Sequence, residues 1–265
     1  MPKKIKLYGF NNLTKALSFN IYDVCWAKEN RAQTEYIAYI DEQYNAERLR
    51  GILESVAGMI GARVLNISSQ DYDPQGASVT MLISNDAEIE RVSGSSIHRL
   101  SGETELFHLD KSHITVHTYP EYHPDNPIAT FRVDIDVATC GEITPLSALD
   151  FLIGSFDSDI ITMDYRVRGF TREMDGKKLF MDHEIASIQD YISDKTLDRY
   201  EAADINLSES NLFHTKMLIR EIDLQNYLFN TETGKLTGED RREIESSLRQ
   251  EMMEIYAGRN IFSLG

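Results

Sequence analysis

The sequence is short of the residues that mark several classes of protein. Its 265 residues include only two cysteines, Cys25 and Cys140, which argues against a disulfide framework. No run approaches the roughly 18 apolar residues that a membrane span requires, and the N-terminal lysines are followed by the mixed stretch Leu7-Tyr8-Gly9-Phe10-Asn11-Asn12, where a signal peptide would have a continuous apolar one. We therefore expect a cytoplasmic protein with no membrane partner.

Basic residues are scarce relative to acidic ones. Lys and Arg total 27 against 43 Asp and Glu, a formal net charge of −16. Such a charge opposes binding to the phosphates of nucleic acids and anionic lipids, so no nucleic-acid partner is expected. The charge is compatible with a cationic small substrate, but it selects no function by itself.

Apolar spacing predicts helices scattered among short strands. Apolar residues three or four positions apart predict helices over residues 44–60, from Thr144-Pro145 onward, over residues 185–192 and from Thr237 to Gly258. Alternating or β-branched segments predict strands over residues 62–68, 78–84, 113–118, 130–138, 159–168 and 212–219. Residues 85–107 show no period and read as an exposed insertion.

The strands alternate between apolar and polar residues instead of being continuously apolar. This pattern is typical of an α+β fold with a largely antiparallel sheet and helices packed on one face, a two-layer α/β sandwich. No linker rich in proline or glycine divides the chain, so residues 1–265 are expected to form a single domain.

Residues 110–121 concentrate side chains capable of chemistry. The strand predicted here places His113 and His117 on one face but about 13 Å apart, too far to share one zinc ion. Ser112 could be a nucleophile, but no Gly-x-Ser-x-Gly elbow surrounds it. From the residues alone a polar strand edge is the simpler interpretation, and Cys140 alone is more typical of a small buried side chain than of a reactive thiol.

Several segments, in the same order along the chain, resemble the S-adenosylmethionine decarboxylase proenzymes, specifically their longer bacterial group. The resemblance covers almost the whole chain and is carried by residues 7–15, 70–79, 110–121, 139–141 and 164–172.

The resemblance implies that the chain cleaves itself between Lys111 and Ser112. Residues 1–111 and 112–265 would become two subunits, and Ser112 would become a pyruvoyl group. His117 would take the Ser112 α-proton during processing, and Ser78 would hydrogen-bond the intermediate. A neutral imidazole is suited to this transfer near pH 7.

In the mature enzyme, the resemblance implies that the pyruvoyl ketone forms a Schiff base with S-adenosylmethionine and accepts electrons as carbon dioxide leaves. Cys140 would return a proton to the α-carbon, Glu121 would bind the ribose hydroxyls and Tyr72 would stack on the adenine. The product would be the aminopropyl donor for spermidine synthesis. Stimulation by Mg²⁺ and assembly into a homo-oligomer are also implied, although no magnesium ligands can be identified.

Two alternatives remain open. A pyruvoyl-dependent decarboxylase of ornithine or arginine would use the same chemistry, but Tyr72 and Glu121 favour an adenosine-containing substrate. An uncleaved regulatory paralogue would lack pyruvoyl altogether, but it would have no need of Ser112, His117, Ser78 and Cys140 together.

Overall fold

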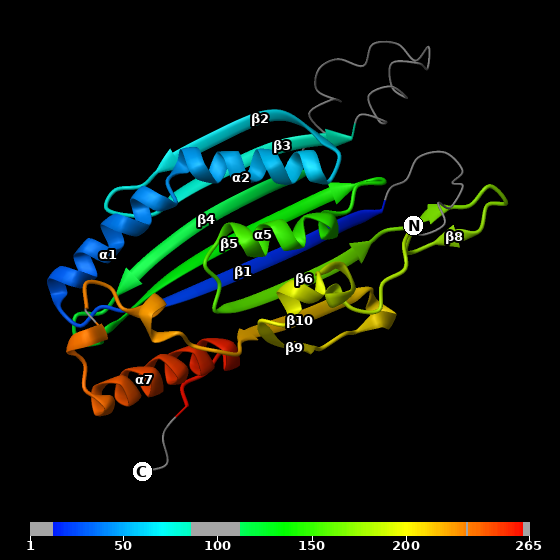
Figure 1. The fold of residues 1–265 in the computed structure, drawn as a ribbon. Helices are drawn as coiled ribbons and strands as arrows, with labels where there is room; N and C mark the ends of the chain where they lie inside the picture. Colours follow the sequence, from blue (N-terminus) through cyan, green and yellow to red (C-terminus); the bar gives the residue numbers. More distant parts are fainter. Residues whose placement is uncertain (1–12, 86–111, 232, 262–265) are drawn as a thin grey trace.

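One eight-stranded antiparallel sheet runs through the molecule in the order β2-β3-β4-β5-β1-β6-β10-β9 (Figure 1). The computed structural model describes residues 13–85, 112–231 and 233–261, so Lys111 and most of the predicted insertion lie outside the described residues. The strands of the sheet are β1 (Thr14–Trp26), β2 (Ala62–Asp71), β3 (Ala77–Asn85), β4 (His113–Tyr122), β5 (Ile128–Cys140), β6 (Ile160–Arg168), β9 (Tyr200–Asp204) and β10 (Leu212–Ile219).

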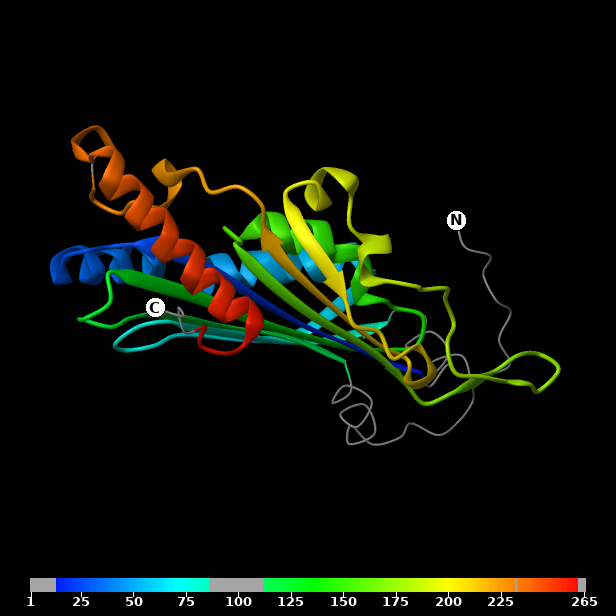
Figure 2. The same ribbon diagram turned by 90° about the horizontal axis from the view of Figure 1, so that it is seen from below.

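Helices cover both faces of this sheet to different extents. The helices of the described residues are α1 (Asn30–Gln43), α2 (Ala46–Met59), α5 (Leu149–Ser155), α6 (Asp194–Leu197) and α7 (Gly238–Ala257), and β7 (Thr171–Arg172) pairs with β8 (Lys178–Leu179) in a separate hairpin. Figures 1 and 2 show α1, α2 and α5 on one side of the sheet. In the described ranges, no helix is both long and apolar enough to cross a membrane.

The side chains of each strand alternate between the two faces. One face is apolar and packs beneath α1, α2 and α5, where β1 contributes Leu17, Phe19 and Ile21, all at most 1% exposed. The other face is polar over most of its area and is called the open face below. Among the helices of the described residues, only α7 packs on it, at the end where Trp26, Ile160 and Leu248 belong to one apolar cluster. The predicted α+β sheet is therefore confirmed, with α7 on the second face as an addition.

The clearest helix signals correspond to observed helices. Asn45 caps α2 by accepting a hydrogen bond from the backbone of Arg48 at 2.9 Å, and Gly61 follows with a positive φ of 72°. Thr237 and Asp240 form the predicted capping box of α7, which ends at Gly258. Full burial of each apolar side chain on such helices contributes about 1.5–3 kcal/mol.

Two local predictions differ from the structure, and two elements were not predicted. Residues 185–192 form only a 3₁₀ turn at Ile188–Tyr191, so the predicted helix is wrong. Thr144 precedes a 3₁₀ turn and α5, but its side chain makes no capping hydrogen bond. The central strand β1 and helix α1 lie where no element was predicted.

Two carboxyl groups are buried together where β1 passes the start of β6. Asp159 accepts hydrogen bonds from the Tyr227 hydroxyl at 2.6 Å and the Val24 amide at 2.9 Å, which favours its ionised form. Burial and then the charge of Asp159 raise the pKa of Asp23 well above its ordinary value. Burial also raises the pKa of Asp159, to about 6. Asp23 is therefore the protonated member and donates to Asp159.

This pair makes stability depend on pH. The carboxyl groups of the unfolded chain lose their protons above a pKa near 3.8. Because the native pKa values are raised, the folded state keeps a proton above that pH. The free energy of unfolding therefore falls as the pH rises above about 3.8. Asp23→Asn retains a donor without this titration. We expect the variant to be at least about 1 kcal/mol more stable than the wild type at pH 7.5.

Urea unfolding at pH 5 and pH 7.5 measures this effect. The wild type should lose stability between the two values, and Asp23→Asn should lose much less. Asp136→Asn, which removes an exposed carboxylate from β5, is the matched control and should follow the wild type. Parallel pH profiles for Asp23→Asn and wild type would contradict the assignment.

Candidate active site

Three of the predicted site residues come together on the open face, at the turn between β2 and β3. The register of β3 and β4 pairs Ser78 with His117, and both side chains are half-buried. The Tyr72 hydroxyl lies 2.7 Å from Ser78 Oγ. A backbone hydrogen bond of 2.8 Å from the Tyr72 amide to the Gly76 carbonyl closes the turn that brings these side chains together.

The His117 ring is bordered by groups that sequence reasoning did not select. It stacks on Tyr119 with 6.3 Å between centroids, and the Arg132 guanidinium lies 4.3 Å from the centre of the Tyr119 ring. Arg132 also donates to Asp134 at 2.8 Å, and Asp134 is the cross-strand partner of His117. Burial raises the pKa of Asp134 while Arg132 opposes the shift. For Arg132 and Asp134 the only signal was their position on the polar side of an alternating strand.

Glu121 lies on the same face, further along β4. Its cross-strand partner is Thr130, and its position four residues beyond His117 puts it about 13 Å away along the strand. Glu121 is exposed, as are the rings of Tyr72 and Tyr119, at 43% and 44%. This end of the open face therefore presents aromatic rings and a carboxylate to solvent.

Ser112 lies at the opposite end of β4. It directly precedes the strand, is 6% exposed, and its carbonyl accepts a hydrogen bond from the Ile83 amide at 3.1 Å. Ser112 and His117 are five positions apart, which corresponds to about 16 Å of extended chain. Because side chains alternate, the two also point to opposite faces.

Cys140 lies at the same end as Ser112. It is the last residue of β5, and it pairs with Thr14. Six residues of β5 separate it from Asp134, the partner of His117, so Cys140 and His117 are about 20 Å apart. The structure thus divides the predicted site residues into a Tyr72–Ser78–His117 group and a Ser112–Cys140 group.

The predicted strand spacing of the two histidines is observed. His113 and His117 both lie on β4 and face Leu82 and Ser78 respectively. Among the described residues, no three His, Cys, Asp or Glu side chains are grouped in a way that could hold a metal ion. The part of the chain that the structure describes therefore contains no ligand set for a magnesium ion.

Gly76 is required by the turn that carries Tyr72 and Ser78. Its φ is +88°, and a Cβ there would lie 2.6 Å from the Thr118 carbonyl oxygen. We expect Gly76→Ala to lower the free energy of unfolding by about 2 kcal/mol. Gly58→Ala in α2, where a Cβ meets no atom within 4 Å, should instead add about 0.5–1 kcal/mol. Urea unfolding compares them, and a neutral Gly76→Ala would show that the turn can relax.

Comparison with known proteins identifies relatives along almost the whole chain. The family model described as S-adenosylmethionine decarboxylase matches residues 38–169. The S-adenosylmethionine decarboxylase proenzyme of Clostridium botulinum (strain Eklund 17B / Type B) is 66% identical over 268 residues, which cover 99% of this chain and 98% of the relative. That of Alkaliphilus oremlandii (strain OhILAs) is 63% identical over 267 residues, 99% of each.

A crystal structure of the adenosylmethionine decarboxylase from Aquifex aeolicus VF5 aligns with 60% of this chain and 90% of its own, at 19% identity and a TM-score of 0.33. Sequence identities of 59–66% over nearly the full length establish that these proteins and this chain are homologous. The chain belongs to the S-adenosylmethionine decarboxylase family.

Proposed function

We propose that the chain is a proenzyme that cleaves itself and then decarboxylates S-adenosylmethionine, supplying the aminopropyl donor for spermidine synthesis. The observation that carries this proposal is the full-length identity of 66% to a proenzyme of that name. The motif residues Ser112, His117, Ser78 and Cys140 are all present to support it. The thiol forms of Cys25 and Cys140, which form no disulfide, suit a reducing compartment such as the cytoplasm.

Self-cleavage would begin at Ser112. Its hydroxyl attacks the Lys111 carbonyl, the peptide bond becomes an ester, and Ser78 hydrogen-bonds the oxyanion. His117 then removes the Ser112 α-proton, and the carboxyl end of Lys111 leaves. Water hydrolyses the remaining dehydroalanine to a pyruvoyl group and ammonia.

The geometry around Ser112 fits a cofactor made from the chain itself. The hydrogen bond between the Ser112 carbonyl and Ile83 would hold the new terminus at the end of β4 after the cut. The strands β1, β2 and β3 would belong to one subunit and the remaining strands to the other. Because β1 lies between β5 and β6, the two subunits would stay interleaved in one sheet.

Each remaining site residue has a role in decarboxylation. The pyruvoyl group supplies the carbonyl that draws electrons from the bond to the departing carboxylate. Cys140 holds the proton that replaces the carboxylate on the substrate α-carbon. The exposed Tyr72 ring stacks on adenine, and the Glu121 carboxylate accepts hydrogen bonds from two ribose hydroxyls. Stimulation by Mg²⁺ stays a prediction from the family resemblance, since the described residues include no group that could hold the ion.

A complete site requires two copies of the chain. His117 is about 20 Å from Cys140 within one sheet, a separation that no side chain spans. A homo-oligomer in which the open face of one sheet meets the end of β4 and β5 of the other would bring the Ser78–His117 pair of one copy to the Ser112–Cys140 end of its partner. Twofold symmetry would make two equivalent sites.

Ser112→Ala removes the hydroxyl that starts cleavage. We expect a single uncut chain of 30.3 kDa on a denaturing gel and no release of labelled carbon dioxide from carboxyl-labelled S-adenosylmethionine. Wild type and the control Ser55→Ala, on the exposed side of α2, should give two fragments that meet at residues 111 and 112. An uncut active wild type would contradict the proposal, and faster turnover of ornithine or arginine would favour the alternative substrate.

Co-expression of inactive variants tests the shared site. His117→Ala and Cys140→Ala should each be inactive or strongly impaired alone. Together they should recover about a quarter of wild-type activity, since half of random dimers are mixed and each mixed dimer has one intact site. Ser112→Ala with Cys140→Ala is the matched control and should recover none, because both defects lie at the same end of one chain. Equal recovery in both pairs, or none in either, would contradict a site built from two copies in this way.

A further inference from the structure

The turn that carries Cys140 is bonded to its neighbours on both sides of the thiol. Before it, Thr139 Oγ1 donates to the Ile143 carbonyl at 3.0 Å. After it, Gly141 adopts a φ of +72°, and its amide donates to the Leu13 carbonyl at 3.2 Å. The backbone on either side of Cys140 is therefore tied into β1 and the segment that follows β5.

A buried cation also contacts this turn. The alternation of β1 directs Lys15 to the helix-covered face, where it is 2% exposed. Its ammonium donates to the Gly141 carbonyl at 2.9 Å and to Asp182 at 2.8 Å. An apolar side chain is often at least as stabilising as a buried ion pair. The contribution that an apolar side chain could not make is the hydrogen bond to Gly141.

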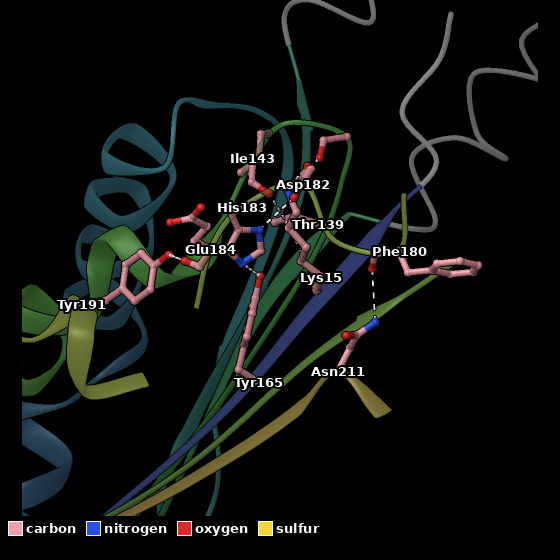
Figure 3. Close-up of polar contacts among 11 residues, drawn as sticks. Lys15, Thr139, Ile143, Tyr165, Phe180, Asp182, His183, Glu184, Tyr191 and Asn211 are labelled. Atoms are coloured by element: carbon pink, nitrogen blue, oxygen red, sulfur yellow. Dashed lines mark hydrogen bonds and ion pairs between the residues drawn. The ribbon is translucent and has the colours of Figure 1, made fainter. Parts of the chain in front are cut away.

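Asp182 is itself held in place by a chain of hydrogen bonds that ends in the core (Figure 3). Its second oxygen lies 2.8 Å from His183 Nδ1, and His183 Nε2 lies 3.1 Å from the hydroxyl of the fully buried Tyr165. One histidine tautomer satisfies both contacts, donating to Asp182 and accepting from Tyr165. Anchored in this way, Asp182 presents a fixed carboxylate to Lys15.

The network joins parts of the chain that are distant in sequence. Lys15 and Asp182 are 167 residues apart, and both lie outside residues 38–169, the part matched by the family model. Cys140 and Gly141 lie inside that part. Segments on either side of the matched region therefore converge on the turn that holds the thiol.

We propose that Lys15, held by Asp182 and His183, is a positioning residue that fixes the Cys140–Gly141 turn so that the Cys140 thiol protonates the substrate α-carbon. This inference rests on the proposed function. Lys15 touches no reacting atom and acts through the Gly141 carbonyl. In the step it supports, the S–H bond breaks and a C–H bond forms with the electron pair left by carbon dioxide, and water later reprotonates the thiolate.

A displaced thiol would deliver its proton late or to the wrong carbon. If the proton reaches the carbon that was the pyruvoyl ketone, hydrolysis with one water leaves the substrate nitrogen on the chain as an amino-terminal alanine. The decarboxylated substrate is then released as an aldehyde. The number of turnovers before inactivation therefore reports the placement of the thiol separately from the stability of the fold.

Lys15→Met removes the ammonium and keeps most of the side-chain volume. We expect kcat per cleaved chain to fall at least about tenfold with KM changed less than about twofold, and turnovers before inactivation to fall in parallel. Lys15→Arg should recover most of the loss because it restores a buried donor. Lys216→Met is the control, since it removes a similar hydrogen bond, to the Tyr256 carbonyl at 2.8 Å, away from Cys140.

An unchanged kcat in Lys15→Met, even with a lower Tm, would overturn the proposal. If Lys15→Met does not fold, Asp182→Asn serves instead, because it is isosteric, removes the charge that orients Lys15 and leaves only one oxygen to accept from Lys15 and His183. Its kcat should fall in the same direction, and an unchanged value would overturn the proposal equally.

Alkylation of Cys140 by iodoacetamide measures the turn without requiring activity. Peptide mass spectrometry separates it from Cys25, whose thiol is buried and has a raised pKa. In the uncleaved Ser112→Ala background, Lys15→Met should change the rate at Cys140 at least about threefold, and an unchanged rate would overturn the proposal. A wild type that fails to cleave or to decarboxylate S-adenosylmethionine would refute the proposed function instead, and the alkylation rates would still test the role of Lys15.

Discussion

The pairing of β1 with β5 on one side and β6 on the other is the interaction on which the rest of the structure depends. It places a segment from near the N-terminus at the centre of the sheet, between strands that follow it by more than 100 residues. The strands β6, β10 and β9 reach the β2–β5 meander only through β1. Without this strand the sheet would separate into two parts, each with an unpaired edge.

Because side chains alternate along each strand, the two faces of the sheet have different roles. One face buries an apolar core beneath three helices, and substitutions there act on packing. The other face is largely free of helices, since α7 covers only one end of it. Polar groups such as Ser78 and His117 are accommodated on this face because they remain partly solvated, whereas under the helices each would need a buried partner.

Sequence patterns predicted the parts of the fold in which apolar residues alternate without interruption. The strand β5 is such a case, because Phe131, Val133 and Ile135 occupy its buried positions in turn. In β1 the buried row also contains Lys15 and Asp23, whose partners Asp182 and Asp159 are distant in sequence. No local pattern reveals such a partner, so the most central strand was also the least predictable.

Similar limits apply to the candidate site. Family resemblance selected Ser112, His117 and Cys140, but it carried no information on their separation, which follows from strand register. The wrong helix prediction for residues 185–192 has a similar cause. Ile188 and Ile192 have helical spacing, but they are buried by tertiary contacts around a 3₁₀ turn. Arg132 was missed because a charged residue on a polar strand face is ordinarily a solvated one. Its contact with Tyr119 exists only after β4 and β5 have paired.

The two ends of the open face are held by different kinds of contact, and the difference suits the proposed roles. Around Tyr72 and His117 the contacts are partly exposed rings and hydroxyls, so the proposed binding of adenosine there would require little rearrangement. Around Cys140 they are buried, ending in Lys15 and the core residue Tyr165. A group that binds a large substrate must be accessible, whereas a group that transfers a proton must be held within a fraction of an ångström. A charged side chain buried at Lys15 is costly for folding alone, and its presence is explained if it holds the Cys140 turn to that tolerance.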